Sequence, residues 1–243
     1  METWKPNNNV VLCLNGHSIA ANGDFVVIEI DKGQFTLCDC NSSESMHYFT
    51  TSKEGLFTRW VPCEENTENR ISVTGGVITH SVGRSDLGVK VDNNATFTMY
   101  GGTICGNKLQ GSYNGAGVYV HNSTFNMYGG AIRGNAASWG GGVAALGSTF
   151  NMYGGVISDN MVSASAGGVL LSDKSVMNMS GNAQIRTTLL PPNGRHQVAE
   201  CIYLPALTEK SVTAYICPIM RKSAAIQPPK EVLCMYVKTV RLP

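Results

Sequence analysis

Carboxylate side chains, which can catalyse the hydrolysis of glycosidic bonds, are scarce in the central part of this sequence. Residues 71–185 contain no Glu and four Asp, namely Asp86, Asp92, Asp159 and Asp173. Hydrolysis commonly uses two carboxyl groups about 5–9.5 Å apart. Asp92 and Asp173 follow equivalent strands three repeats apart, which at about 4.8 Å per repeat would separate them by about 14 Å. Asp159 is expected to form an ion pair with Arg133 of the preceding repeat, so no catalytic pair is assigned.

Other catalytic groups are present but isolated. A polysaccharide lyase would need an acidic calcium site and a basic proton acceptor, for which Arg84 beside Asp86 and Asp92 is the nearest candidate. Charged surface turns explain these residues more simply. Three histidines stand on separate repeats without a Ser or Cys partner, at His17, His80 and His121. Because a triad needs such a partner, we expect a non-enzymatic protein, with a polysaccharide lyase or glycoside hydrolase as the alternative.

Aromatic residues are the more distinctive surface feature. Tyr100, Tyr128 and Tyr153 occupy equivalent positions of the repeat, and strand alternation places them on its outer face. Trp139 and Tyr113 are expected in nearby turns. Sugars stack on such rings, and neighbouring Asn and Ser side chains supply hydrogen bonds. These five residues could form a glycan-binding platform, or the tyrosines could simply support one another along the sheet.

The eight cysteines do not have the spacing of a metal site. The sequences LCLN and LCDC lack the CxxC pattern of zinc ligands, so we predict no metal and no cofactor. Cys13, Cys38, Cys40 and Cys105 lie within or beside predicted strands and are interpreted as core or ladder residues. Disulfides could form among them in an oxidising compartment.

A repeated motif organises most of the chain. Three close copies, TFTMYGGTICGN, TFNMYGGAIRGN and TFNMYGGVISDN, are anchored at Met99, Met127 and Met152. Looser copies are anchored at Leu14, Leu37, Val73 and Met179, with successive spacings of 23, 36, 26, 28, 25 and 27 residues. The motif therefore indicates seven repeats, with an insertion at about residues 41–70 that accounts for the spacing of 36. Ile and Asn recur five and eight residues after the anchor, at Ile19, Ile78, Ile104, Ile132 and Ile157 and at Asn22, Asn107, Asn135 and Asn160.

A unit of about 26 residues with short strands cannot bury its apolar side alone, so successive units must stack. Parallel stacking places Phe97, Phe125 and Phe150 in one inward column. Asn at a fixed turn position tolerates left-handed backbone and can bond to its neighbours above and below. Because parallel crossovers are right-handed, we predict an all-β, right-handed parallel β-helix of about seven coils over residues 1–185.

These motifs resemble a known family. LCLNGHSI, FTLCDC and the repeated F-x-MYGG-x-I-x-(G/D)N and GGV elements are similar to the pectin-lyase-like repeats of bacterial surface and secreted proteins, over about residues 10–185. GGAI at residues 129–132 is also similar to an element of polymorphic outer-membrane autotransporters. The resemblance implies an extracellular or cell-surface β-helix that acts as an adhesin or glycan-binding stalk. A purely structural spacer is the remaining alternative, because such repeats specify a scaffold better than an activity.

Composition excludes several partners. Charged residues form 14% of the chain and the formal net charge is +1, which gives no electrostatic basis for binding nucleic acid. No run of apolar residues is long enough for a membrane span, and no secretory signal is visible, so the chain could be a fragment of an exported protein. Residues 186–243 lose the repeat and contain seven of the nine prolines; we interpret them as a cap, a linker or a disordered segment. The oligomeric state is not predicted.

Overall fold

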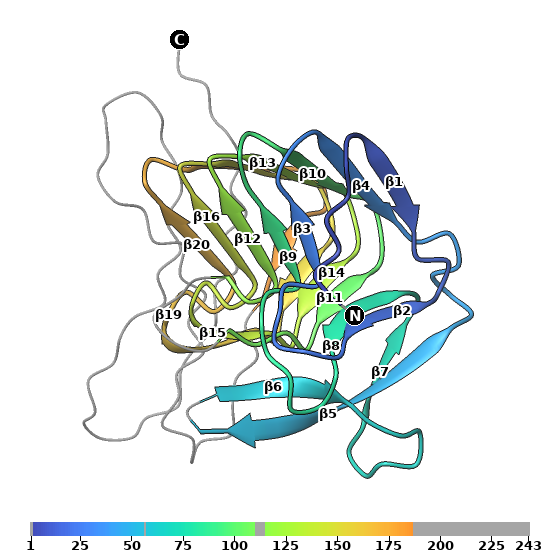
Figure 1. The fold of residues 1–243 in the computed structure, drawn as a ribbon. Helices are drawn as coiled ribbons and strands as arrows, with labels where there is room; N and C mark the ends of the chain where they lie inside the picture. Colours follow the sequence, from blue (N-terminus) through green and yellow to red (C-terminus); the bar gives the residue numbers. More distant parts are fainter. Residues whose placement is uncertain (1, 56, 110–114, 187–243) are drawn as a thin grey trace, which may run out of the picture.

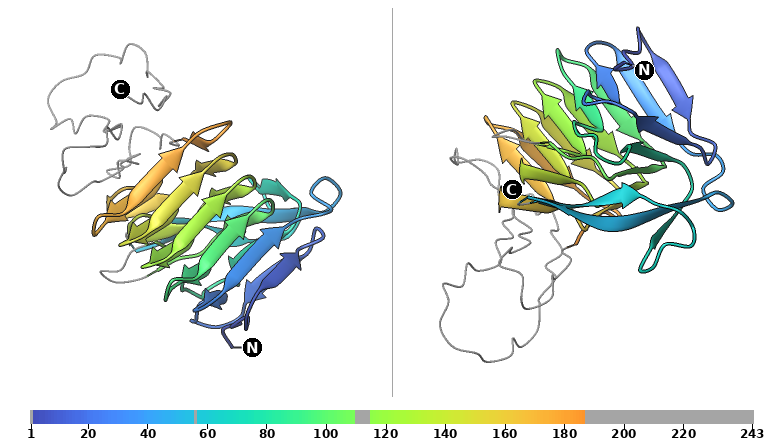
Figure 2. Two further views of the ribbon diagram at one scale, coloured as in Figure 1. Left: turned by 90° about the horizontal axis from the view of Figure 1, so that it is seen from above. Right: turned by 60° about the horizontal axis from the view of Figure 1, so that its bottom comes forward.

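The chain forms a right-handed parallel β-solenoid of six coils, seen in a computed structural model that describes residues 2–55, 57–109 and 115–186. Figure 1 shows the coils stacked side by side, and Figure 2 shows the same stack from above. The predicted fold class is confirmed. Apart from Arg186, the predicted C-terminal segment at residues 186–243 lies outside the described residues, and so does Tyr113.

Three parallel sheets form the walls of the solenoid. Sheet 1 contains β1 (Val10–Cys13), β4 (Gln34–Cys38), β10 (Thr96–Met99), β13 (Thr124–Met127), β17 (Thr149–Met152) and β21 (Val176–Met179). Sheet 2 contains β2 (Ser18–Ala21), β8 (Val77–His80), β11 (Thr103–Cys105), β14 (Ala131–Arg133), β18 (Val156–Ser158) and β22 (Gln184–Ile185). Sheet 3 contains β3 (Ile28–Ile30), β9 (Val89–Val91), β12 (Val118–His121), β16 (Val143–Leu146) and β20 (Val169–Ser172). A short fourth pair joins β15 (Ala136–Trp139) to β19 (Met161–Ser165).

Like residues stack on like residues through the centre of the solenoid. In β10, β13 and β17 buried and partly buried residues alternate, so Phe and Met point inward while Thr and Asn point outward. Phe97 pairs with Phe125 and Phe125 with Phe150, and their ring centroids are 4.9 and 4.8 Å apart. The isoleucines predicted as a ladder also pair in register through sheet 2, ending at Ile185. The core is therefore continuous from coil to coil.

The buried asparagines bond to one another, but their backbone differs from the prediction. Asn107 Nδ2 donates to Asn135 Oδ1 (3.0 Å), and Asn135 Nδ2 donates to Asn160 Oδ1 (2.9 Å). The left-handed residue is the one before each Asn: Gly106, Gly134 and Asp159 have φ of 68°, 64° and 58°. Asn22 is exposed and is outside this ladder.

The insertion belongs to the second coil, and its last strand ends at Thr74, beyond the predicted boundary at about residue 70. It forms the antiparallel sheet of β5 (Met46–Glu54), β6 (Phe57–Pro62) and β7 (Ile71–Thr74), between β4 and β8. The prediction of seven coils counted Val73 as an anchor, but Val73 pairs antiparallel with His47 of β5. The segment SVTGGVIT therefore resembles the repeat in its letters while only its last strand, β8, joins a parallel sheet.

The insertion lies along one corner of the solenoid, beneath the sheets in Figure 1. Trp60 N–H donates to the carbonyl of Gly134 (2.9 Å), and Arg59 Nη1 donates to the carbonyl of Gly106 (2.7 Å). A Cβ at Gly134 would lie 2.2 Å from the Trp60 ring, so glycine is required for this approach. No helix among the described residues is long and apolar enough to cross a membrane.

Candidate functional site

The three predicted tyrosines form a column on the outer surface, where sheet 1 turns into sheet 2. Each follows the last Met of its strand, so the register that stacks the methionines also stacks the tyrosines. The ring centroids of Tyr100 and Tyr128 are 4.9 Å apart, and those of Tyr128 and Tyr153 are 4.8 Å apart. Their exposed fractions are 55%, 46% and 38% from Tyr100 to Tyr153.

This stacking limits how a ligand could approach the column. Tyr128 carries a stacked ring on both sides, so a sugar cannot lie flat on it. Tyr100 and Tyr153 each have a stacked ring on one side only among the described residues. The tyrosines therefore do support one another, as the alternative interpretation holds, and only the two ends of the column can offer a ring face.

A hollow of about 290 Å³ lies at the Tyr100 end of the column. Its lining consists of Asp39, Ser42, Thr74, Tyr100, Gly101, Gly102, Thr103, Gly130 and Ala131. This set combines one aromatic ring, a carboxylate and three hydroxyls from two coils and the edges of the insertion. Pockets for small ligands begin at about 300 Å³, so the hollow suits one small ring rather than an extended chain.

Asp39 fixes one wall of the hollow. Its Oδ1 accepts a hydrogen bond from Gly16 N–H and its Oδ2 accepts one from Gly76 N–H, both at 2.7 Å. These bonds tie the second coil to the turn of the first coil and to the end of the insertion. The wall is therefore rigid, because both carboxylate oxygens are held by backbone groups.

Trp139 does not join this site. It ends β15, close to the turn into sheet 3, whereas the tyrosines occupy the turn between sheets 1 and 2. Its exposed fraction is 41%, and its carbonyl accepts a hydrogen bond from Gly115 N–H (2.9 Å). Of the predicted platform residues that the structure describes, the three tyrosines therefore lie together and Trp139 lies at a different corner of the solenoid.

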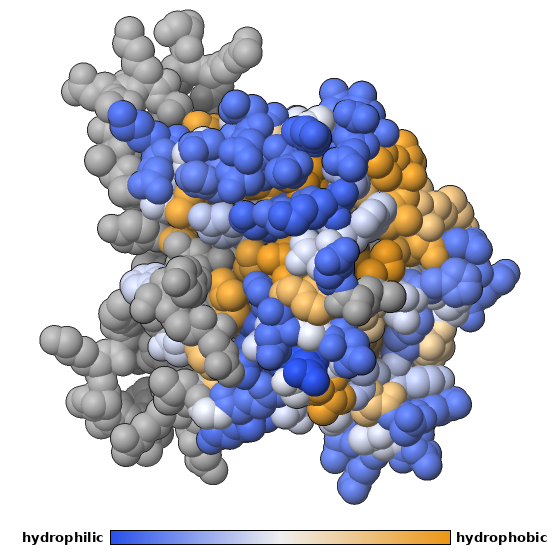
Figure 3. Space-filling view, in the orientation of Figure 1, coloured by the Kyte–Doolittle hydropathy of each residue, from blue (hydrophilic) through white to orange (hydrophobic). Residues whose placement is uncertain are grey.

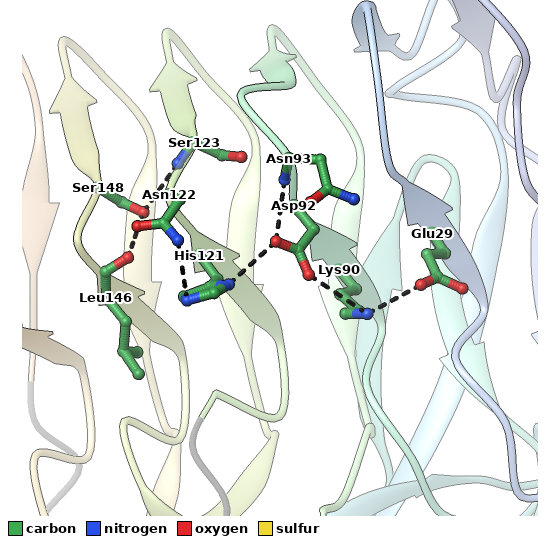
Figure 4. Close-up of polar contacts among 9 residues, drawn as sticks. All are labelled: Glu29, Lys90, Asp92, Asn93, His121, Asn122, Ser123, Leu146 and Ser148. Carbon is green, nitrogen blue, oxygen red and sulfur yellow. Dashed lines mark hydrogen bonds and ion pairs between the residues drawn. The ribbon is translucent and has the colours of Figure 1, made fainter.

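A row of charged residues crosses the outer side of sheet 3, where sequence reasoning found no site (Figure 4). Lys90 Nζ bonds to Glu29 Oε1 at 2.9 Å and lies 3.6 Å from Asp92 Oδ2. His121 Nδ1 lies 3.0 Å from Asp92 Oδ1. The sequence could have predicted the contact between His121 and Asp92, because Asp92 directly follows β9 and His121 ends the neighbouring strand β12.

The positive charges and hydrogen-bond donors of this row lower the pKa values of its two carboxylates. Burial alone would raise the pKa of Asp92, but hydrogen bonds from His121 and the Asn93 N–H, with the charge of Lys90, lower it overall. The pKa of Glu29 is lowered in the same way, since the two nearby lysines, Lys5 and Lys90, outweigh its burial.

Hydrophilic side chains also form a band along this edge of the molecule, where sheet 3 leads into sheet 1 (Figure 3).

His121 and Asp92 do not complete a nucleophilic triad. His121 Nε2 lies 3.1 Å from Asn122 Nδ2, so this ring nitrogen faces an amide donor rather than a serine hydroxyl. Ser123 follows, but its N–H donates to Ser148 Oγ (3.1 Å) as part of a serine ladder between coils. Among the described residues, the ring nitrogens of His121 therefore contact Asp92 and Asn122.

The other charged residues considered from sequence have separate partners. Arg84 lies 3.9 Å from Asp24, and the carboxylate of Asp86 accepts a hydrogen bond from Leu87 N–H. The predicted pair of Arg133 and Asp159 is wrong. The Arg133 guanidinium lies 5.3 Å from the centre of the Trp60 ring of the insertion, and Asp159 accepts a hydrogen bond from its neighbour Ser158.

Comparison of the chain with protein-family models, with curated proteins and with solved structures finds no match. The chain is therefore described by its architecture, a parallel β-solenoid with a surface column of tyrosines that ends at a small polar hollow.

Proposed function

We propose that this chain is a non-enzymatic β-helix module of a secreted or cell-surface protein, serving as an adhesin or stalk that binds carbohydrate in the hollow at Tyr100. The observation that carries the proposal is the position of Tyr100. It ends a rigid column of rings, it is the most exposed of the three tyrosines, and it alone of them lines the hollow.

The chemistry of the hollow fits a sugar ring. A sugar presents an apolar face of C–H groups, which packs on an aromatic face, and a rim of hydroxyls, which needs donors and acceptors. Ser42, Thr74 and Thr103 offer hydroxyls beside Tyr100, and each Asp39 oxygen, although bonded to a glycine N–H, has a second lone pair that can accept. Because the column and the Asp39 bonds hold these groups in place, a ligand would order few side chains on binding.

The motifs support the proposed setting. Their similarity to pectin-lyase-like repeats of surface and secreted proteins, and more distantly to outer-membrane autotransporter repeats, favours an exported scaffold. The disulfide between Cys13 and Cys40 is typical of an oxidising compartment. The described carboxylates favour a binding role over hydrolysis, since Asp39 is the single carboxylate in the hollow.

A glycan array tests the proposal with matched variants. We expect wild-type protein to bind a subset of glycans, and Tyr100→Ala to weaken that binding about tenfold, the equivalent of about 1.4 kcal/mol. Tyr153→Ala is the control, because it removes the same ring, with one stacked neighbour among the described residues, from the end of the column that does not line this hollow.

Three results would decide against parts of the proposal. No binding by wild-type protein to any glycan would leave the structural spacer as the better account. Equal loss in Tyr100→Ala and Tyr153→Ala would place the ligand elsewhere. Release of reducing ends or of unsaturated products from pectins or host glycans would show a hydrolase or lyase and overturn the non-enzymatic assignment.

A further inference from the structure

Three cysteine sulfurs gather at the end of sheet 1, on the same line of coils as the tyrosine column. Cys13 ends β1 and Cys38 ends β4, and the two are directly paired in register. Cys40 lies two residues beyond Cys38 and is joined to Cys13 by a disulfide. The Sγ atoms of Cys13, Cys38 and Cys40 all lie within 4.8 Å of one another.

The strands position these sulfurs before any ligand arrives. Cys38 Sγ lies 3.4 Å from the carbonyl of Leu12, and Cys40 N–H lies 3.0 Å from Cys13 Sγ. Cys13 and Cys38 are partly buried and Cys40 is exposed, so the cluster is open to solvent on one side. Both oxygens of Asp39, which stands between Cys38 and Cys40, are held by glycine N–H groups and point to other partners.

The other described cysteines differ from this cluster. Cys105 is fully buried, and its burial raises the pKa of its thiol to about 12, so it stays protonated. Cys63 lies beyond the end of β6 in the insertion and belongs to no group of metal-binding side chains in the described residues. Only three cysteines therefore combine proximity with access to solvent in the part of the chain that the structure describes.

We propose that, when the disulfide is reduced, Cys13, Cys38 and Cys40 bind one thiophilic metal ion, with Cu(I) as the ion that fits best. Thiolate ligands select soft ions such as Cu(I). Metal–sulfur bonds of about 2.3 Å place the sulfurs of a three-coordinate site about 4 Å apart. The sulfurs of Cys13 and Cys40, which are bonded in the disulfide, must separate to that spacing after reduction, and Cys38 Sγ lies within 4.8 Å of both. Zn(II) fits less well because structural zinc sites take four protein ligands, and the cluster has three.

The site is linked to the redox state of the chain. Binding forms three Cu–S bonds and releases the protons of three thiols, while copper remains Cu(I). A disulfide oxidant such as oxidised glutathione removes the site: the Cys13 and Cys40 thiols become one disulfide, and two molecules of reduced glutathione form. The oxidised chain retains one of the three ligands, Cys38, and so loses the ion. This inference is independent of carbohydrate binding.

The test uses the full chain with the competing thiols replaced. In a background with Cys63, Cys201, Cys217 and Cys234 changed to Ser, the reduced protein is titrated anaerobically with Cu(I) against a chromophoric chelator. We expect one Cu(I) per chain, with ultraviolet thiolate-to-copper absorption. Cys38→Ser in the same background should bind Cu(I) at least 100-fold more weakly, because two sulfurs remain.

Cys38→Ser also controls for folding, since Cys38 is outside the disulfide. Its oxidised form should keep the Cys13–Cys40 disulfide and the β-sheet circular dichroism of the parent. Treatment of the loaded parent with oxidised glutathione should release the copper. Equal Cu(I) affinity in Cys38→Ser, no binding by the reduced parent, or tighter binding of Zn(II) than of Cu(I) would each overturn the proposal. Tyr100→Ala should bind Cu(I) as the parent does.

Discussion

The coils stack each residue on an equivalent residue, whereas the insertion pairs unlike residues in an antiparallel sheet. Phe97, Phe125 and Phe150 form one column within the coils, each on the same residue of the next turn. In the insertion, Phe49 stands opposite Pro62 and Ile71 instead. Repetition gives the coils a continuous core, while a second, small core of Phe49, Trp60, Val73, Val77 and Cys105 forms where the insertion packs on β8 and β11.

The two regions also differ in what they can contribute to binding. The coils build straight columns whose members cover one another, as the stacked tyrosines show. A concave site needs an interruption of that regularity. The hollow at Tyr100 lies where the insertion leaves and rejoins the second coil, with Ser42 and Thr74 at its two ends.

The largest expected effect is a loss of stability, and it tests whether the two cores unfold independently. Phe125→Ala should reduce the free energy of unfolding by about 3–5 kcal/mol, because Phe97 and Phe150 each lose the ring that is stacked between them. Chemical denaturation measures the loss, and hydrogen exchange locates it over β10, β13 and β17. Phe49→Ala is the counterpart and should raise exchange mainly in β5–β7. Exchange that spreads through all coils after Phe49→Ala would contradict the separation of the cores.

A second prediction concerns the buried Asn ladder. Asn135→Ala should cost about 2–4 kcal/mol, because unsatisfied buried groups cost about 1–3 kcal/mol each. Asn107 loses an acceptor for both its N–H and its Nδ2, and the Ile104 carbonyl loses a donor. Asn126→Ala, which removes the acceptor of Asn151 on the outer face, should cost less than about 1 kcal/mol. Equal midpoints in urea for the two variants would refute the difference.

A third prediction compares two equivalent turns, of which only one lies against the insertion. Gly134 and Asp159 follow paired strand ends and share left-handed backbone, but Gly134 lies against the Trp60 ring. Gly134→Ala should cost about 2–3 kcal/mol, more than the 1–2 kcal/mol of left-handed backbone alone, and it should change Trp60 fluorescence.

Asp159→Ala should cost at most about 1 kcal/mol, since that residue already has a side chain in this conformation. In a Trp60→Ala background the clash at Gly134 is removed, so the effect of Gly134→Ala should fall. An unchanged effect in that background would show that backbone strain, rather than the insertion, requires glycine there.

The smallest expected effect lies on the polar outer side of the coils. The folded-state pKa of Asp92 is lowered, so its contribution to stability is present above the unfolded value of about 3.9 and is lost as the pH falls through the folded value. Wild-type protein should therefore melt higher than Asp92→Asn near pH 7, and the difference should vanish toward low pH.

Sequence alone predicted the coils well, because stacking repeats each contact and a repeated letter marks a repeated position. The Phe, Ile and Tyr columns could all be assigned in this way. It failed at Val73, where the letters imitate the repeat but the strand pairs antiparallel with β5. The hollow was not predictable, since it depends on where the fold places Ser42 and Thr74 and on the hydrogen bonds of Asp39. The lateral contact of Arg133 with Trp60 was missed for the same reason.

Residue-resolved amide hydrogen exchange on the wild-type chain tests the stacked solenoid most directly. The amides of Asn107 and Asn135, which donate to the Asn side chain of the next coil, should be among the slowest to exchange. Amides at the far end of the insertion, such as that of Lys53, should exchange faster because that hairpin opens without the coils. Ladder amides that exchange as fast as exposed turns, or an insertion more protected than the coils, would contradict the account.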